Sequence, residues 1–210
     1  MAQMKNIEKS LSHLNSDLLS AMMEQGELKE IPAGTEILRE GQYVKVIPIV
    51  IKGLIKVLTR HDDKELLLYY IRPKESCIMS FAASLKNEPS RVFASTEEDT
   101  QALLLPVDKV SKWTAQFPDI NNLFFQQYNM RYADLLDTIH HVLFDKLDKR
   151  LHDYLEEKVA LTKQNPLKMS HREIANELAT SREVISRTMK KLESENLIKQ
   201  HSNSIELLNR

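Results

Sequence analysis

The chain has 210 residues, enough for one large or two modest domains, and its 42% hydrophobic and 28% charged residues are ordinary for a globular protein. No apolar run approaches the about 20 residues of a membrane span, and no signal peptide pattern opens the chain, so we expect a cytoplasmic protein without a membrane partner. The one cysteine, Cys77, excludes an intramolecular disulfide framework and a four-cysteine metal site within one chain.

The first half of the chain predicts one helix followed by short strands. Apolar residues recur at helical spacing over residues 7–23, and Gly26 fits the end of that helix. From Ile31 onward, short β-type runs alternate with turns at Gly34, Gly41 and Gly53, which indicates an antiparallel sandwich or barrel. The predicted strands are Glu36–Arg39, Val46–Ile51, Ile55–Thr59, Leu66–Ile71, Val92–Ser95 and Ala102–Leu105, with Asp62-Asp63 in a hairpin loop.

A long helix is predicted in the middle of the chain. A short helix begins at Asp108 and closes at Pro118, and the long one runs from about Asp119 to Val142. Six apolar residues of the long helix recur at spacings of 3, 4, 3, 4 and 3, the seam of two supercoiled helices: Phe125, Tyr128, Tyr132, Leu135, Ile139 and Val142. The seam could instead pack within the subunit, but a second stripe of Phe124, Leu136 and Leu143 is available for that contact. The pattern therefore favours a parallel homodimer.

Residues 170–193 predict a helix-turn-helix. Ser170 and Glu173 form a capping box that starts the first helix, and Ala179-Thr180-Ser181 provides a short connection. The second helix has an apolar face of Ile185, Met189 and Leu192. Its opposite face carries Arg182, Glu183, Ser186, Arg187 and Lys190. An ordinary helical hairpin with a solvated charged face is the alternative, but Arg and Glu on one face suit the guanine and cytosine edges of the major groove.

The surroundings of this motif support the same interpretation. Asp145 is a predicted N-cap of a preceding helix, and Leu197-Ile198 and Ile205–Leu208 flank a polar turn that reads as a small β-wing. Residues 168–210 hold eight Lys and Arg against six Asp and Glu, a net charge of +2, so the whole-chain −1 leaves −3 for residues 1–167. The positive charge is thus concentrated in the part predicted to contact DNA.

This order of elements resembles the catabolite activator protein/FNR (CRP/FNR) superfamily of bacterial transcription regulators over roughly residues 20–208. Ile31-Pro32-Ala33-Gly34, Gly41 and Ile51-Lys52-Gly53 look like that family's turns, and residues 118–155 align without a gap with its dimer helix and hinge. Ser181-Arg182-Glu183-x-x-Ser186-Arg187 is similar to its base-reading signature. The resemblance implies an α+β fold: a cyclic-nucleotide-binding-like β-roll (a double-stranded β-helix or jelly roll) at 1–117, a dimerisation helix and hinge at 118–144, and a winged helix-turn-helix at 145–210.

The resemblance also implies roles for residues and partners. Arg182, Glu183 and Arg187 would read base edges, and Ser186 would contact a neighbouring base or thymine methyl. Ser170 and Ser181 would donate to phosphate, and Lys190 lies on the same face. We expect Ser181, rather than Thr180, to cap the second helix, so that Glu183 does not fold back on the backbone. The partners implied are a palindromic duplex DNA, a second copy of the chain and RNA polymerase.

The segments that would bind an effector in this family have a different sequence here. The cyclic-nucleotide binders of this family hold the ligand with a Gly-rich turn, a Glu and an Arg-Ser pair. Here Met79 stands at the glycine position, Ser80 stands at the glutamate position, and the pair is reversed to Ser90-Arg91. On the central helix, Leu135 and Leu136 replace hydroxyl residues. A cyclic-nucleotide effector is therefore not expected. The remodelled pocket is predicted around Cys77, Met79, Ser80, Phe81, Arg91, Tyr128, Leu135 and Leu136, for an apolar or small anionic effector or for none.

No cofactor and no metal site are predicted, and we do not expect an enzyme, because no metal-ligand spacing, nucleophile elbow or phosphate loop is present. One alternative is a regulator that binds haem through Cys77 with His140 or His141, and another is a thiol-based redox sensor. However, Cys77 lies in an apolar run, which is more typical of a buried small residue. A rival of another class is a ligand-binding signalling module whose helix-turn-helix mediates protein contacts.

Overall fold

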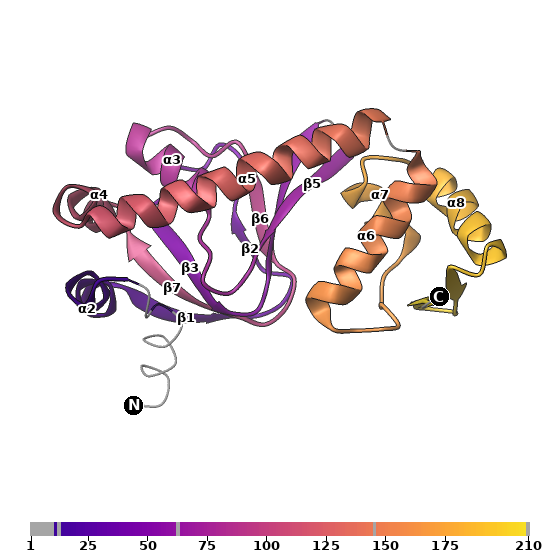
Figure 1. The fold of residues 1–210 in the computed structure, drawn as a ribbon, viewed down its shortest axis with the longest axis horizontal. Helices are drawn as coiled ribbons and strands as arrows, with labels where there is room; N and C mark the ends of the chain where they lie inside the picture. The colour runs from indigo at the N-terminus through magenta and orange to yellow at the C-terminus, as the bar shows by residue number, and fades with distance from the viewer. Residues whose placement is uncertain (1–10, 12–13, 62–63, 145, 209–210) are drawn as a thin grey trace. The chain divides into compact units, whose positions relative to one another are not determined.

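The computed structural model describes residues 11, 14–61, 64–144 and 146–208 (Figure 1). The chain forms two compact units, the first of Met1–Thr59 with Leu68–Leu135, and the second of Arg60–Leu67 with Leu136–Arg210. In the described residues, no helix combines the length and the apolar character that a membrane crossing requires.

Two antiparallel sheets form the β-roll. One sheet has the order β1 (Glu27–Ile31), β7 (Thr100–Pro106), β3 (Val46–Lys52). The other has the order β2 (Glu36–Leu38), β6 (Phe93–Thr96), β4 (Ile55–His61), β5 (Lys64–Ile71). In the first sheet Ile49 lies opposite Leu103, and β3 is buried from Ile47 to Ile51, as its continuous apolar run predicts. The six predicted strands are confirmed to within two residues at each end.

Two elements of the first unit escaped the sequence prediction. β1 is an edge strand whose sequence, Glu27-Leu28-Lys29-Glu30-Ile31, is mostly charged and exposed, so it has no clear alternation. The other is the short helix α3 (Ile78–Lys86), which follows Cys77. The predicted hairpin loop Asp62-Asp63 lies outside the described residues.

Gly53 is required by the turn between β3 and β4. Its φ is +92°, a conformation that side chains with a Cβ disfavour. A Cβ there would lie 2.5 Å from Thr100 Oγ1 and 2.7 Å from the Asp99 carbonyl oxygen, so the backbones are too close for any larger residue.

Helices cover the roll and complete its main core. α2 (Ser16–Gln25) buries Leu18 and Met22, and α4 (Val107–Gln116) buries Trp113. The long helix α5 (Pro118–Phe144) contributes Phe124, whose ring stacks on Phe81 with the ring centres 3.6 Å apart. The predicted N-terminal helix over residues 7–23 was wrong in its start: α2 begins at Ser16, because Asn15 caps it by accepting the Asp17 amide. Residues 7–10 and 12–13 lie outside the described residues.

The second unit is a winged helix-turn-helix. It contains α6 (Leu147–Thr162), α7 (His171–Glu177), α8 (Arg182–Ser194) and a two-stranded wing of β8 (Ile198–Gln200) and β9 (Ile205–Leu207). Its core includes Leu151, Leu155, Ile174, Ile185, Met189 and Ile198. α6 begins after Lys146, whose side chain makes no capping bond, and the predicted cap Asp145 lies outside the described residues.

A buried polar cluster joins α6 to α7 inside this core. The Tyr154 hydroxyl donates to Glu177 Oε2 at 2.7 Å, and Lys158 Nζ lies 3.4 Å from the same oxygen. The side chains of Lys158 and Glu177 are only 2% and 4% exposed. The cluster therefore fixes the first helix of the motif against α6 through charges that are almost fully removed from water.

Candidate DNA interface and effector cavity

The helix-turn-helix is built by two serine caps. Ser170 Oγ accepts the Glu173 amide at 3.2 Å while Glu173 Oε2 accepts the Ser170 amide at 2.6 Å, which confirms the predicted capping box. Ala179 takes a left-handed φ of +53° in the connection. Ser181 then caps α8 by accepting the Val184 amide at 3.3 Å, as predicted. These local bonds fix where each helix begins, and so which residues share a face.

α8 has two distinct faces. Ile185, Met189 and Leu192 are buried against the domain core. The structure places the predicted base-reading and phosphate-binding side chains on the other side, where all but half-buried Ser186 are exposed: Arg182, Glu183, Ser186, Arg187 and Lys190. Ser170 and Ser181 are exposed at the starts of α7 and α8.

Glu183 stands in the first turn of α8 with its carboxylate exposed. Its own backbone amide and then the Ser181 hydroxyl lower the pKa of this carboxylate. The unpaired amides and the positive end of the helix dipole favour a negative charge in this position. Ser181 caps the helix through the Val184 amide, as predicted.

His171 is a residue of this site that the sequence did not single out. Its Nδ1 lies 2.9 Å from Ser186 Oγ, which joins the start of α7 to the exposed face of α8. Beside it, α7, α8 and the wing enclose an open hollow with polar and basic side chains, including Lys168, His171, Arg172, Arg182 and His201. Only the helix-turn-helix geometry could reveal the bond, because the two residues are 15 positions apart.

Two further contacts hold α8 in place. Glu193 accepts the Gln200 amide at 2.7 Å and the Gln200 side-chain amide at 2.8 Å, which lowers the pKa of Glu193 and ties the wing to α8. Lys191 forms an ion pair with Asp148 of α6 and lowers the pKa of that carboxyl. Lys191 therefore has a partner inside the domain.

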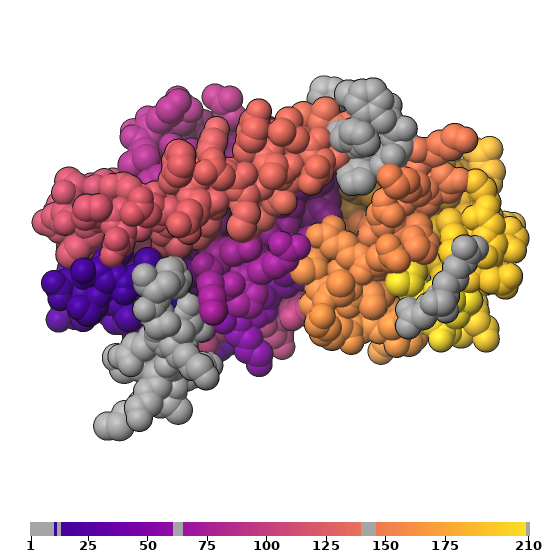
Figure 2. All heavy atoms as spheres, viewed as in Figure 1, coloured from indigo at the N-terminus to yellow at the C-terminus, as the bar shows by residue number. Residues whose placement is uncertain are grey.

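The predicted dimer seam lies on an exposed face of α5. Phe125, Tyr128, Tyr132, Leu135 and Ile139 are all exposed, whereas the side chain of Val142 lies outside the described part. The atoms of α5 stand at the surface on the face shown in Figure 2. The stripe predicted to pack within the subunit was wrong in part: Phe124 is buried, but Leu136 is 48% exposed. The buried stripe is instead Ile120, Leu123, Phe124, Gln127 and Arg131.

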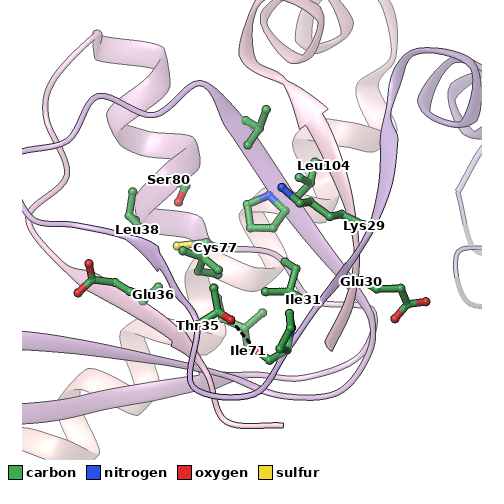
Figure 3. A pocket seen from close by; sticks show the side chains of 15 residues that line it. Lys29, Glu30, Ile31, Thr35, Glu36, Leu38, Ile71, Cys77, Ser80 and Leu104 are labelled. Carbon is green, nitrogen blue, oxygen red and sulfur yellow. Dashed lines mark hydrogen bonds between the residues drawn. The ribbon is translucent and has the colours of Figure 1, made fainter. Parts of the chain in front are cut away.

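A cavity in the β-roll is lined by only two of the residues predicted for the effector pocket. It has a volume of about 380 Å³ and lies between the edge strands β1 and β2. Of the predicted pocket residues, Cys77 and Ser80 line it; Figure 3 shows both, with Lys29 extending toward the cavity from β1 and Glu30 pointing away. Its apolar lining includes Ile31, Leu38, Ile71, Ala94 and Leu104.

The other predicted pocket residues lie elsewhere. Met79 and Phe81 pack against the hydrophobic cores. Arg91 is 81% exposed and pairs with Glu88 at 3.6 Å. Tyr128, Leu135 and Leu136 are exposed on α5. The three α5 residues do not line this cavity, because the buried face of α5 carries Gln127 and Arg131 instead.

Two models of known protein families match this chain, each over a separate stretch of residues. The family model described as a cyclic nucleotide-binding domain matches residues 28–117, and the one described as a Crp-like helix-turn-helix domain matches residues 149–210. The chain belongs to the CRP/FNR family of transcription regulators. Its β-roll, long helix and winged helix-turn-helix confirm the predicted fold.

Relatives of this CRP/FNR chain are distant but of similar length. The CRP-like protein Clp of Xanthomonas euvesicatoria is 22% identical over 206 residues, which cover 92% of this chain and 89% of Clp. A crp/fnr-family regulator from Eubacterium rectale superposes with a TM-score of 0.85 at 23% identity, covering 95% of this chain and 93% of that one. Clp of Xanthomonas campestris, described as a c-di-GMP-responsive global regulator, superposes with a TM-score of 0.81 at 18% identity over 93% of this chain and all of that one.

In this CRP/FNR chain an internal network around the buried Arg131 includes Glu75 and Ser76, at the start of the segment that the resemblance places at the family's phosphate-binding turn. Arg131 of α5 is paired with Glu75, and with Asp134 at 2.7 Å. Burial opposes the charged form of Arg131, but the carboxylates of Glu75 and Asp134 outweigh it and raise the guanidinium pKa. Gln127 accepts the Ser76 amide at 2.7 Å. The guanidinium of Arg131 and the side-chain amide of Gln127, both on α5, thus hold Glu75 and Ser76 of this segment.

Proposed function

We propose that this CRP/FNR regulator reads a palindromic DNA site as a homodimer, with α8 in the major groove of each half-site. The observation that carries the proposal is the outward face of α8, where Arg182, Glu183 and Arg187 are exposed on a helix anchored by its buried stripe. Guanidinium groups pair with the guanine edge, and a carboxylate accepts from the cytosine amino group. Ser170, Ser181 and Lys190 would contact phosphates and set the register.

Substitution tests the base-reading role. We expect Arg182→Ala or Glu183→Ala to weaken binding to the selected site by about 1–3 kcal/mol, with a much smaller loss on a scrambled duplex. Lys86→Ala, which removes an exposed charge from α3 of the β-roll, is the control. Gel-shift titrations measure the affinity of the wild type and the three variants for both duplexes. Equal losses on the selected and scrambled duplexes would refute base reading.

The homodimer proposal is supported by the exposed aromatic and aliphatic face of α5. Monomers seldom leave such a continuous apolar stripe in water, and its 3–4 spacing suits a parallel coiled coil. Tyr132→Glu should therefore convert a dimer into a monomer in sedimentation velocity, because it places a charge in the seam. Tyr43→Glu is the matched control, since Tyr43 is equally exposed, at 55%, but lies outside the helix. A dimer that survives Tyr132→Glu would contradict the seam.

We propose that any effector of the β-roll is small and largely apolar. The cavity volume of about 380 Å³ falls at the small end of ligand pockets, roughly 300–1,000 Å³. Its charged lining residues are Lys29, Glu30 and Glu36, and because Glu30 points away from the cavity, a single cation and a carboxylate remain (Figure 3), a poor setting for the phosphates of a cyclic nucleotide or of c-di-GMP. Arg131 is already paired with Glu75 and Asp134, which also argues against an effector that carries phosphate. Native mass spectrometry of protein purified from cells tests it, and a retained nucleotide would overturn it.

The division into residues 1–117, 118–144 and 145–210, and RNA polymerase as a partner, remain part of the proposal. A salt titration separates DNA binding from a helix-turn-helix used for protein contacts. Binding that neutralises 6–10 phosphates should weaken by about 10³–10⁵ between 50 and 200 mM salt. A salt-independent interaction would favour the protein-contact alternative.

A further inference from the structure

The hydroxyl of Ser186 is held by a side chain from the other helix of the motif. His171 Nδ1 lies 2.9 Å from Ser186 Oγ, and both residues are half-buried. Serine and threonine in helices commonly donate to the carbonyl four residues earlier, and Thr188 of α8 does this to Val184 at 2.9 Å. Among the described contacts, Ser186 makes no such bond, and His171 is the partner of its oxygen. The orientation of this hydroxyl is therefore set from α7.

The bond also decides which hydrogen-bonding group Ser186 offers to DNA. A hydroxyl has one proton and two lone pairs, whereas a neutral imidazole has one N–H and one acceptor nitrogen. The 2.9 Å contact fits both tautomers of His171: with the ring proton on Nε2, Nδ1 accepts the Ser186 hydroxyl proton, and with it on Nδ1, the ring donates to Ser186 Oγ. In the Nε2-protonated tautomer, on which the proposal rests, Ser186 Oγ has only lone pairs left for a base.

We propose that His171 is a specificity-determining positioning residue that makes Ser186 a hydrogen-bond acceptor toward the major groove. The inference rests on the proposed base reading by α8. An acceptor at this position pairs with the exocyclic amino group of adenine (N6) or cytosine (N4), and it is opposed by guanine O6 and N7 and by thymine O4, which are acceptors themselves. The half-site base facing Ser186 is accordingly one that carries an amino group.

The test compares base preference in six full-length proteins, the wild type and five variants, at pH 8, where histidine side chains are ordinarily neutral. The variants are Ser186→Ala, His171→Leu, the double variant and His171→Asn, whose amide oxygen can replace the Nδ1 acceptor. His152→Leu is the control, because His152 is a half-buried histidine of α6 that lies near Glu156 at 3.7 Å instead. Selection from a random duplex library first finds the half-site position whose preference changes in Ser186→Ala. Affinities for all four base pairs at that position then follow, with circular dichroism to check folding.

We expect wild type to favour the amino-bearing bases by about 3- to 10-fold, the scale of one hydrogen bond. His171→Leu should lose that preference at the same position, the double variant should be no worse than either single variant, and His171→Asn should restore most of it. A uniform loss across all four base pairs, an unchanged preference or additive effects would overturn the inference while leaving base reading intact. A wild-type protein without any sequence preference would instead refute the proposed function itself.

Discussion

Replacing Lys158 by Met should selectively destabilise the DNA-binding domain. The substitution removes the ammonium group that lies 3.4 Å from Glu177 Oε2, while the Glu177 carboxylate stays in a site where it is only 4% exposed. Breaking a buried ion pair from one side costs about 3–5 kcal/mol, because the remaining charge is poorly solvated. Replacing both partners by apolar residues is often neutral, so Lys158→Met/Glu177→Leu should recover most of the loss.

Native-state hydrogen exchange on the full-length protein measures this effect where it occurs. In Lys158→Met, the opening free energy of amides in α8 should fall by about 3–5 kcal/mol, whereas amides of β3 and β7 in the other unit serve as an internal control. The double variant should lie close to wild type. Unchanged exchange in α8, or a double variant as unstable as Lys158→Met, would refute the claim that this pair sets the stability of the motif.

Two further predictions concern the wing and the β-roll. The folded pKa of Glu193 is lowered by Gln200, so its contact stabilises the wing above the ordinary glutamate pKa of about 4.3 and is lost as the pH falls through the lowered value. The Gln200 amide shift in NMR should therefore titrate below the ordinary range, and Glu193→Gln should abolish that titration. Gly53→Ala should reduce the free energy of unfolding by about 1–3 kcal/mol in urea titrations followed by Trp113 fluorescence, because the new Cβ would collide with Asp99 and Thr100 at the start of β7. Gly34→Ala, whose φ of +75° is similar but which has open space around it, should cost only about 1 kcal/mol.

Local signals explain most of what the sequence could predict. The capping box at Ser170, the cap at Ser181 and the apolar stripe of α8 are formed by residues within one or two helical turns, so their spacing alone places the helices. The buried strand β3 is likewise evident from its continuous apolar run. β1 could not be predicted in this way, because an edge strand with three charged residues out of five has no buried face to show.

Long-range contacts account for what was missed. The cavity combines residues from β1 to β7, and nothing in the spacing of Lys29, Cys77 and Leu104 indicates that they face one space. The pairing of Glu75 with Arg131 joins residues 56 positions apart, and it determines which face of α5 turns inward. The contact between His171 and Ser186 likewise joins residues that are far apart in the sequence, 15 positions in this case. The correction to the intramolecular stripe of α5 arises from such contacts.

The central claim is that α8 reads DNA sequence on behalf of a symmetric dimer. Selection of wild-type protein on a random duplex library, followed by sequencing, measures it most directly. The account predicts an enriched inverted repeat with half-sites one helical turn apart, which is about 10–10.5 base pairs from centre to centre. It also predicts that Arg187→Ala alters the enriched bases at matching positions of both half-sites. An enriched site without symmetry, or one that Arg187→Ala leaves unchanged, would contradict it.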